Sequence, residues 1–444
     1  MVMAELIARK KAGKPLTNEE IAWWIEGYVQ GNIPDYQVSA LLMAICFNGM
    51  SPEETLALTL AMVRSGDVAD LSAISGFKVD KHSTGGVSDA TTLVVAPIVA
   101  ACGVKVAKVS GRALGHTGGT VDKLESIPGF DVALSVERLA DIVNRVGVVI
   151  TGQSGGFVPA DKALYALRDV TATVDSIPLI ASSVMSKKIA AGADGIVLDV
   201  KAGSGAFMHS TGDAFTLAKL MVEIGTGAGR KTVALVTDMD QPLGMTVGNS
   251  LEVQESIEVL KGAADGALLE LSLLLATEML LLSGSPGREA ARQAAEEALR
   301  SGRALDRFRG MVEAQGGNPA IVEDYSLLPQ AKREIPLVSA QAGFVTGFDT
   351  EAVGTAAAYL GAGRLTKDDP IDLAAGIVLM KRAGNPVQEG ETIAILHTGD
   401  RSKVAKAEEA LRGAIHIGAK PPVPKPLVFG RVTSAGIDIP ELDW

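Results

Sequence analysis

The stretch VDKHSTGGVSDATTLVVAPIVAACGVKVAKVSGRALGHTGGTVDKLE, residues 79–125, decides the fold that we predict for this chain. Residues 77–80 predict a short buried strand, and residues 81–86 predict a glycine turn before an apolar helix at about 89–102. A second strand is predicted at 104–109. Strand, helix and strand in this order indicate a βαβ unit with parallel strands.

A second glycine-rich turn follows at 111–119, and the side chains around both turns suit a phosphate. A glycine turn before a helix leaves backbone N–H groups unpaired at the positive end of the helix, where an anion can bind. Neither turn has the GxxxxGK[ST] or GxGxxG spacing, so either one alone is equally well explained as a plain connector. Two such turns at neighbouring strand ends, each with lysine and serine or threonine, favour a phosphate or a phosphorylated ligand.

Two motifs in this stretch resemble the signature of the pyrimidine nucleoside phosphorylases, the family that includes thymidine phosphorylase. They are KHSTGG at 81–86 and SGRALGHTGGTVDKLESIPGF at 110–130, and the second is long and specific. The resemblance continues through PADKALYALRDVTATVDSIPLIASSVMSKKIAAGADGIVLDVKAGSGAFM at 159–208 and TDMDQPLG at 237–244. It extends from there to the C-terminal region and so covers nearly the whole chain.

The sequence predicts an α/β protein with a small all-α domain, a large α/β domain with a mostly parallel sheet, and a β-rich, hammerhead-like C-terminal module. The sequence permits the chain to return to the helical layer after the first strands, and the resemblance implies that it does. The predicted parts are 1–69 with 160–192, 70–159 with 193–335, and 336–444. A cleft between the first two is expected to close about linkers at 66–76, 152–159 and 192–195.

Composition excludes some classes of protein. The 444 residues carry a net charge of −11, which argues against nucleic acid as a general partner, because binding to phosphate backbones needs a surplus of Lys and Arg. No apolar run reaches the roughly 20 residues of a membrane span, and the N-terminus has no export-type apolar core. Cys46 and Cys102 lie in apolar helical runs, which favours buried thiols and a cytoplasmic location.

The resemblance implies an enzyme in which inorganic phosphate attacks C1′ of a pyrimidine nucleoside and releases the free base and a pentose 1-phosphate. The positions that match the family's phosphate ligands are Lys81, His82, Ser83, Thr92, Lys108, Val109, Ser110 and Thr120. Those that match its pyrimidine contacts are Arg168, Ser183 and Lys187, with Tyr165 as a neighbour of the base. The side chains among the phosphate positions offer donors to an anion.

Three residues are candidates for the chemical step: His82, Arg168 and Lys187. His82 stands between two phosphate positions, so we expect it to carry a proton for the leaving base, whereas His116 is expected to order the second turn. Ser183 and Lys187 are spaced to share one helix face. Without the resemblance, a solvated helix face would be the better explanation of Lys187.

The resemblance further implies a homodimer formed through the α domain, no organic cofactor, and a potassium ion. The potassium positions are Ser88, Ala90, Leu243, Thr246 and Glu255. The family often has glycine at the position of Ser88 and threonine at that of Ala90. Backbone carbonyls survive both changes, whereas the threonine hydroxyl is lost.

The sequence leaves three other functions open. One is a strict thymidine phosphorylase, although the residues at 181–188 and 238–244 look closer to members with broad pyrimidine specificity. Another is a phosphoribosyltransferase of the anthranilate phosphoribosyltransferase type, which would need an acidic pair for magnesium pyrophosphate. We find no such pair beside Asp199, which we place at a strand end. The third is a noncatalytic phosphate-binding protein.

Overall fold

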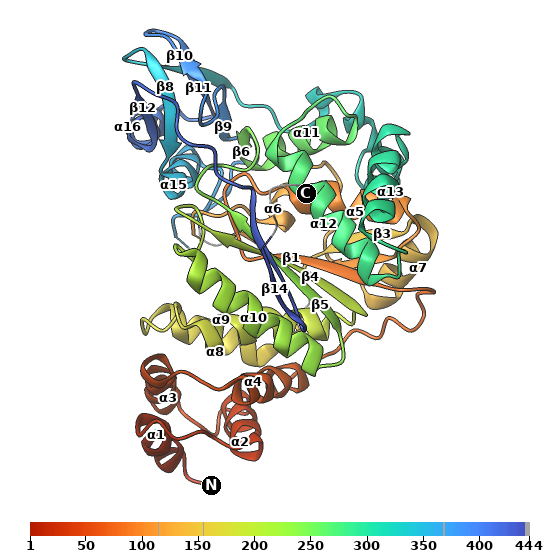
Figure 1. Cartoon of the computed structure of the whole chain (residues 1–444), viewed down its shortest axis with the longest axis vertical. Coiled ribbons are helices and arrows are strands. Elements are labelled where there is room, and N and C mark those ends of the chain that lie inside the picture. The colour runs from red at the N-terminus through yellow and green to blue at the C-terminus, as the bar shows by residue number, and fades with distance from the viewer. Residues whose placement is uncertain (114, 154, 367–368, 440–444) are drawn as a thin grey trace.

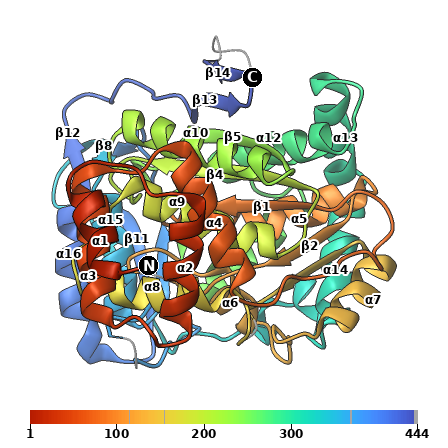
Figure 2. The ribbon, with the colours of Figure 1, turned by 90° about the horizontal axis from the view of Figure 1, so that it is seen from below.

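The computed structural model describes residues 1–113, 115–153, 155–366 and 369–439. The chain begins with four helices at one end of the molecule: α1 (Met3–Lys11), α2 (Asn18–Val29), α3 (Asp35–Asn48) and α4 (Pro52–Arg64) (Figures 1 and 2). Capping boxes at Thr17 with Glu20 and at Ser51 with Glu54 begin α2 and α4. Trp24 is fully buried in this bundle.

A mostly parallel sheet forms the centre of the large domain. Its order is β1 (Val79–Ser83), β4 (Gly195–Ala202), β5 (Lys231–Asp238), β13 (Val428–Thr433) and β14 (Gly436–Asp438). The first three strands are parallel, and β13 joins antiparallel. A parallel pair, β2 (Val106–Val109) with β3 (Val148–Thr151), lies beyond β1, to which the amide of Val79 links it by donating to the carbonyl of Lys105 at 2.9 Å.

Two details of this sheet correct the sequence prediction. Lys81, His82 and Ser83 belong to β1 and not to a turn, because they pair in register with residues 197–199 of β4. The turn therefore begins at Thr84. Asp199 lies inside β4 and not at its end, since that strand continues to Ala202 and pairs with β5 over its whole length.

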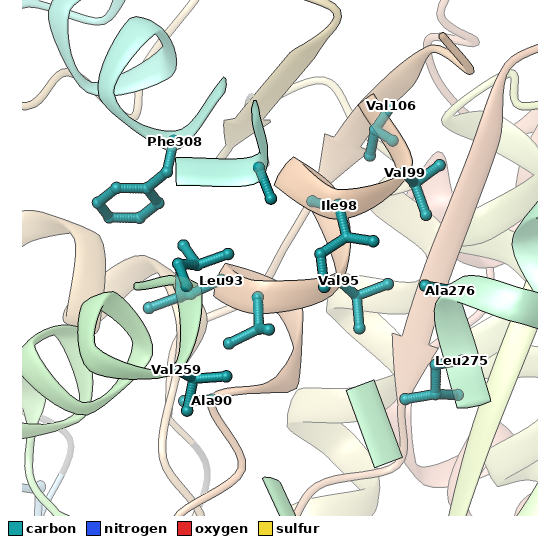
Figure 3. Packing of buried hydrophobic residues seen from close by; sticks show 14 of the residues in the cluster. Ala90, Leu93, Val95, Ile98, Val99, Val106, Val259, Leu275, Ala276 and Phe308 are labelled. Carbon is teal, nitrogen blue, oxygen red and sulfur yellow. The ribbon is translucent and has the colours of Figure 1, made fainter. Parts of the chain in front are cut away.

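Helices cover both faces of the sheet. On one face lie α5 (Thr91–Ala101) and a group after β5, namely α11 (Asn249–Leu260), α12 (Ala267–Leu282), α13 (Arg288–Arg300) and α14 (Arg303–Ala314). All residues of α5 are buried, and Leu93, Ile98 and Phe308 meet in the core that Figure 3 shows. This apolar core fixes the position at which α5 begins, and hence the turn in front of it.

The opposite face carries α10 (Thr211–Gly227) and α9 (Ile177–Ala190), with α8 (Pro159–Asp169) beside them (Figure 1). Helices α8 and α9 also pack on α2 and α4, so the chain does return to the N-terminal helices. One hydrophobic cluster runs from the N-terminal bundle through α8 and α9 to α10 and β4. The helices α6 (Thr120–Glu125) and α7 (Val136–Val146) complete this half of the chain.

The three predicted linkers lie side by side. The amide of Asp67 donates to the carbonyl of Gly156 at 3.0 Å, and that of Ala69 donates to Ala190 at 2.8 Å. Gly192 has φ +83°, and an added Cβ there would lie 2.5 Å from the carbonyl oxygen of Ala69. All three crossings between the helical layer and the sheet therefore pass through one place, as a common pivot requires.

The C-terminal module combines two small sheets with two helices. A four-stranded sheet orders β6 (Thr246–Val247), β9 (Gly376–Leu379), β11 (Thr392–Thr398) and β7 (Arg333–Val338), and a three-stranded one orders β10 (Pro386–Val387), β8 (Gly343–Phe348) and β12 (Ile415–Gly418). Helices α15 (Thr350–Leu360) and α16 (Val404–Ala414) pack with them. Short 3-10 helices span Pro319–Val322, Tyr325–Leu327 and Arg401–Lys403.

The chain then leaves this module and crosses back to the large sheet as β13 and β14, the blue ribbon in the middle of Figure 1. This return was not predicted from the sequence. Within the described part of the chain, no helix is long and apolar enough to cross a membrane.

Candidate active site

The carboxyl end of β1 presents a buried lysine between a carboxylate and a hydroxyl. The Lys81 ammonium donates to Thr91 Oγ1 at 2.5 Å and lies 3.4 Å from Asp199 Oδ2. Asp199 also pairs with the fully buried Lys201 at 2.9 Å. Two buried lysines therefore share the carboxylate of Asp199 at this strand end, and their ammonium groups can donate to an anion.

The first glycine turn is held by a single carboxylate. Asp89 accepts from Ser83 Oγ and from Thr91 Oγ1, each at 2.5 Å. Burial by itself would raise the pKa of Asp89, but Lys81 and the other nearby lysines hold it well below its usual range. Asp89 therefore stays ionised and fixes Ser83 and the first residue of α5.

The two glycine turns touch each other. The amide of Gly118 donates to the carbonyl of Gly86 at 3.4 Å, and a Cβ added to Gly85, whose φ is +103°, would lie 3.3 Å from Thr117 Cγ2. The ring of His116 hydrogen-bonds the carbonyl of Gly205 at 3.1 Å, which agrees with an ordering role for this histidine. The two turns therefore form one surface, as the strand order predicts.

The other predicted phosphate positions surround this surface. Thr92 is the second residue of α5 and is nearly buried, and Thr120 is the first residue of α6, directly after the second turn. Val109 ends β2, and the amide of Ser110 donates to the carbonyl of Thr151 at 2.8 Å. The structure therefore brings the predicted phosphate residues to one edge of the sheet.

Lys108 lies beneath the same edge, in a cluster that crosses from β2 to β1 and α9. Its ammonium donates to the carbonyl of Lys81 and lies 3.4 Å from Asp80 Oδ1. Lys188 of α9 takes the other oxygen of Asp80 at 2.7 Å and donates to the carbonyl of Val109 at 2.9 Å. Burial opposes ionisation of Asp80, but these two lysines outweigh it and lower its pKa.

His82 lies among these cations. Burial and the charges of Lys188, Lys108, Lys81 and Lys187 lower the pKa of its imidazole well below the ordinary value. The ring is therefore neutral at neutral pH, and it could act as an acid, as expected from the sequence, only with a bound anion beside it. Because Lys187 contributes to this lower pKa, the base-contact helix α9 lies within electrostatic range of the phosphate strands.

The predicted base contacts gather on α8 and α9. Lys187 pairs with Asp161 of α8 and donates to Ser183 Oγ at 3.0 Å. Asp161 is buried, and its Oδ1 has no hydrogen-bond partner. This pair holds the ammonium of Lys187 in place on a partly exposed helix face, so that the lysine is not a mobile solvated side chain.

Arg168 has a structural task in addition to the predicted contact. Its guanidinium is buried and donates to the carbonyls of Thr173, Val174 and Leu179 at 3.0, 2.6 and 3.1 Å. These bonds shape the connection between α8 and α9. The Tyr165 ring lies 6.0 Å from the guanidinium carbon, which agrees with a place beside Arg168. A guanidinium has five N–H groups, so donors remain for a ligand.

The predicted potassium positions Ser88, Thr246 and Glu255 also come together, and the amide of Leu243 donates to the carbonyl of Val87 beside them at 3.2 Å. The Glu255 carboxylate accepts from the amide of Met245 at 2.6 Å and from Thr246 Oγ1 at 2.6 Å, and Ser88 Oγ accepts from the amide of Gly244 at 3.0 Å. A Cβ added to Gly244 would press on both Glu255 and Ser88. Ser88 has φ +59°, a left-handed conformation that costs a non-glycine residue about 1 kcal/mol, so the family's usual glycine there has a physical reason.

Sequence patterns did not reveal the carboxylates and two lysines of the site. Asp80, Asp89 and Asp199 hold the predicted donors in place. Lys188, and Lys123, which pairs with Glu252 at 2.6 Å, were not singled out either. The available signal was position, since Asp80 adjoins Lys81 and Lys188 adjoins Lys187.

Comparisons with known proteins agree with this architecture. A model described as the glycosyl transferase family a/b domain matches residues 75–305, and that family's helical bundle domain matches residues 4–66. The pyrimidine nucleoside phosphorylase C-terminal domain matches residues 344–418. In the solved anthranilate phosphoribosyltransferase from Thermus thermophilus, the fold is similar with a TM-score of 0.58 at 21% identity, covering 70% of this chain and 99% of that one. The chain therefore belongs to this family of glycosyl transferases.

Its full-length relatives narrow the assignment. The chain is 54% identical over 434 residues to the pyrimidine-nucleoside phosphorylase of Geobacillus stearothermophilus, covering 98% of this chain and 100% of that one. It is 53% identical over 426 residues to the pyrimidine-nucleoside phosphorylase of Bacillus subtilis (strain 168), covering 96% and 98%. Within the glycosyl transferase family, the chain is a member of the pyrimidine-nucleoside phosphorylases.

Proposed function

We propose that this enzyme catalyses the reversible phosphorolysis of uridine, thymidine and deoxyuridine by direct attack of phosphate on C1′. The observation that carries the proposal is the buried cationic edge formed by Lys81 and Lys108, directly below two joined glycine turns. It offers charge-assisted bonds to a dianion. The relatives' names supply the nucleoside class, and the family membership supports it.

In this mechanism the helical layer and the sheet layer hold different reactants. Lys81, Ser83 and the turn amides would orient phosphate, while Arg168, Ser183 and Lys187 would contact the pyrimidine and stabilise the negative charge that develops on it as the bond to C1′ breaks. His82 would receive its proton-carrying role only after phosphate binds. Closure of the cleft about the three adjoining linkers would exclude water, and the division into 1–69 with 160–192 and 70–159 with 193–335 defines the moving parts.

Release of free base that depends on inorganic phosphate tests this function. We expect uridine and thymidine to be cleaved with comparable efficiency, measured as kcat/KM from the ultraviolet change on base release. Fast cleavage of thymidine beside undetectable cleavage of uridine would establish the strict thymidine phosphorylase instead. Activity only with phosphoribosyl pyrophosphate would favour the phosphoribosyltransferase. The carboxylates of Asp199 and Asp89 both lie beside Lys201, and Asp199 also pairs with Lys81, which argues against magnesium between them.

We further infer that potassium binds at Ser88, Ala90, Leu243, Thr246 and Glu255. The donor set fits, because it offers only hard oxygen ligands: a carboxylate, a hydroxyl and backbone carbonyls. When bound, the ion would brace the first glycine turn through Ser88 and Ala90. Activity in potassium is expected to exceed that in tetramethylammonium, and Glu255→Gln should remove most of this difference. Equal activities of the parent enzyme in both salts would contradict a potassium role.

We also infer a homodimer, with α3 at its interface. Tyr36 and Phe47 are 73% and 81% exposed on α3, and about three helical turns separate them, which puts them on one face. Phe47→Glu is expected to halve the mass measured by light scattering, since it introduces charge into an apolar contact. An unchanged dimer mass would place the interface elsewhere. Cys46 and Cys102 are free thiols, which supports the proposed cytoplasmic location.

A further inference from the structure

Seven charged side chains below the phosphate edge do not balance. Three carboxylates, Asp80, Asp89 and Asp199, lie among four lysines, Lys81, Lys108, Lys188 and Lys201. Asp199 is the counter-ion of Lys81 and Lys201, and Asp80 is the counter-ion of Lys188 and Lys108. The shorter bond of Asp80 is to Lys188, at 2.7 Å against 3.4 Å to Lys108. Lys81 and Lys108 each lie 3.4 Å from a carboxylate that has a nearer lysine. Lys81 also acts on the ionised Asp89, whereas Lys108 has Asp80 alone.

We propose that Asp80 and Lys188 are positioning residues of the phosphate site, which hold Lys108 as an under-neutralised cation that the phosphate dianion completes. The inference rests on the proposed function, because it takes phosphate as the ligand of Lys108. Lys188 also belongs to α9, next to Lys187, and donates to Val109 at the end of β2. One ion-paired cluster thereby ties the base-contact helix to the phosphate strands.

The surroundings of Lys108 determine how its charge responds. The described groups that face it are Asp80, Lys81 and His82 of β1 and Lys188 of α9, and the paired strand β3 contributes no titratable residue over Val148–Thr151. Burial, with Lys188 and Lys81 nearby, lowers the pKa of Lys108 to about 7, and Asp80 only partly opposes this. A bound dianion favours the charged form, so phosphate binding should take up a proton and weaken as pH rises.

The two positioning residues should move this pH dependence in opposite directions. Lys188→Met removes a like charge and leaves Asp80 to Lys108 alone, so the alkaline loss of phosphate affinity should shift upward by about one pH unit. Asp80→Asn removes the counter-ion of Lys108, so the loss should shift downward. The pH range over which phosphate affinity falls is called the alkaline limb. A defect that only loosened the structure would weaken phosphate binding at every pH without moving this limb.

The experiment is calorimetric titration of the full-length protein with inorganic phosphate between about pH 6 and pH 9.5. The titration of phosphate itself is common to all variants, so differences between them report the protein. Lys162→Met is the matched control, because it removes a lysine charge from the exposed side of the neighbouring helix α8 without touching Asp80. Its phosphate affinity should depend on pH as that of the parent does. Lys188→Arg keeps the charge and should also keep the limb.

Each outcome has a distinct meaning. An upward shift for Lys188→Met with a downward shift for Asp80→Asn supports the inference, and shifts in one direction or none overturn it. If Asp80→Asn does not fold, the upward shift of Lys188→Met decides alone. Lys108→Met tests the proposed function separately: parental phosphate affinity in that variant would remove Lys108 from the site, whereas weakened affinity with unmoved limbs would reject only the positioning role.

Discussion

Lys81→Ala is expected to lower kcat/KM for phosphate by about 100-fold, because one charge-assisted bond to a dianion contributes about 1.5–3 kcal/mol. The ammonium of Lys81 lies at the carboxyl end of β1, below the first glycine turn, and its position is fixed by Thr91 and Asp199. Steady-state kinetics with phosphate as the varied substrate measure the change. Inorganic phosphate titrated into the variant shows whether binding itself is lost.

The fold of this variant should persist. Asp199 keeps Lys201 as a counter-ion at 2.9 Å, so the substitution does not leave an unpaired buried carboxylate. Lys231→Ala is the matched control: Lys231 begins β5 of the same sheet, at the end away from the phosphate edge, where it donates to the carbonyl of Leu282. Near-parental phosphorolysis by a folded Lys81→Ala protein would remove the central residue of the proposed site.

Sequence patterns predicted the elements well where local rules determine them. The helix predicted at about 89–102 is α5, Thr91–Ala101, and the strand predicted at 104–109 contains β2, Val106–Val109, because apolar runs and flanking glycines mark these elements. The prediction of secondary structure failed where the pairing of distant strands determines the structure. Lys81 to Ser83 look polar enough for a turn, but hydrogen bonding to β4 keeps them in the strand. The return of β13 to the large sheet depends on a long-range pairing that leaves no local pattern.

The site shows the same limit. The resemblance supplied positions, and the structure brought the phosphate positions together at one edge. The resemblance could not supply the counter-ions, because a carboxylate that pairs with a lysine is recognised by the distance between the two groups in the folded chain. Asp80 and Lys188 are 108 residues apart in sequence, and only the fold brings Lys188 of α9 to Asp80 of β1 and to Val109 of β2.

Lys187→Met should lower kcat for nucleoside phosphorolysis by about 100-fold while phosphate affinity stays near that of the parent. In the proposed mechanism this ammonium stabilises the charge that develops on the departing pyrimidine, and the loss of one such donor costs roughly 10²–10³ in rate. Its contacts are Asp161 and Ser183, on α8 and α9, and none of its described hydrogen bonds reaches a phosphate position. The defect should therefore separate from that of Lys81→Ala.

The substitution leaves Asp161 without its cation, and Asp161 is buried with one oxygen already unpaired. A loss of activity could then arise from a loosened α8–α9 pair. The double variant Lys187→Met/Asp161→Asn removes both charges and should recover thermal stability without recovering kcat. Lys162→Met, on the exposed side of α8, is the control for a lost surface charge. Recovery of kcat in the double variant would show that Lys187 acts only through the packing of the helices. That result would contradict the proposed contact between Lys187 and the base.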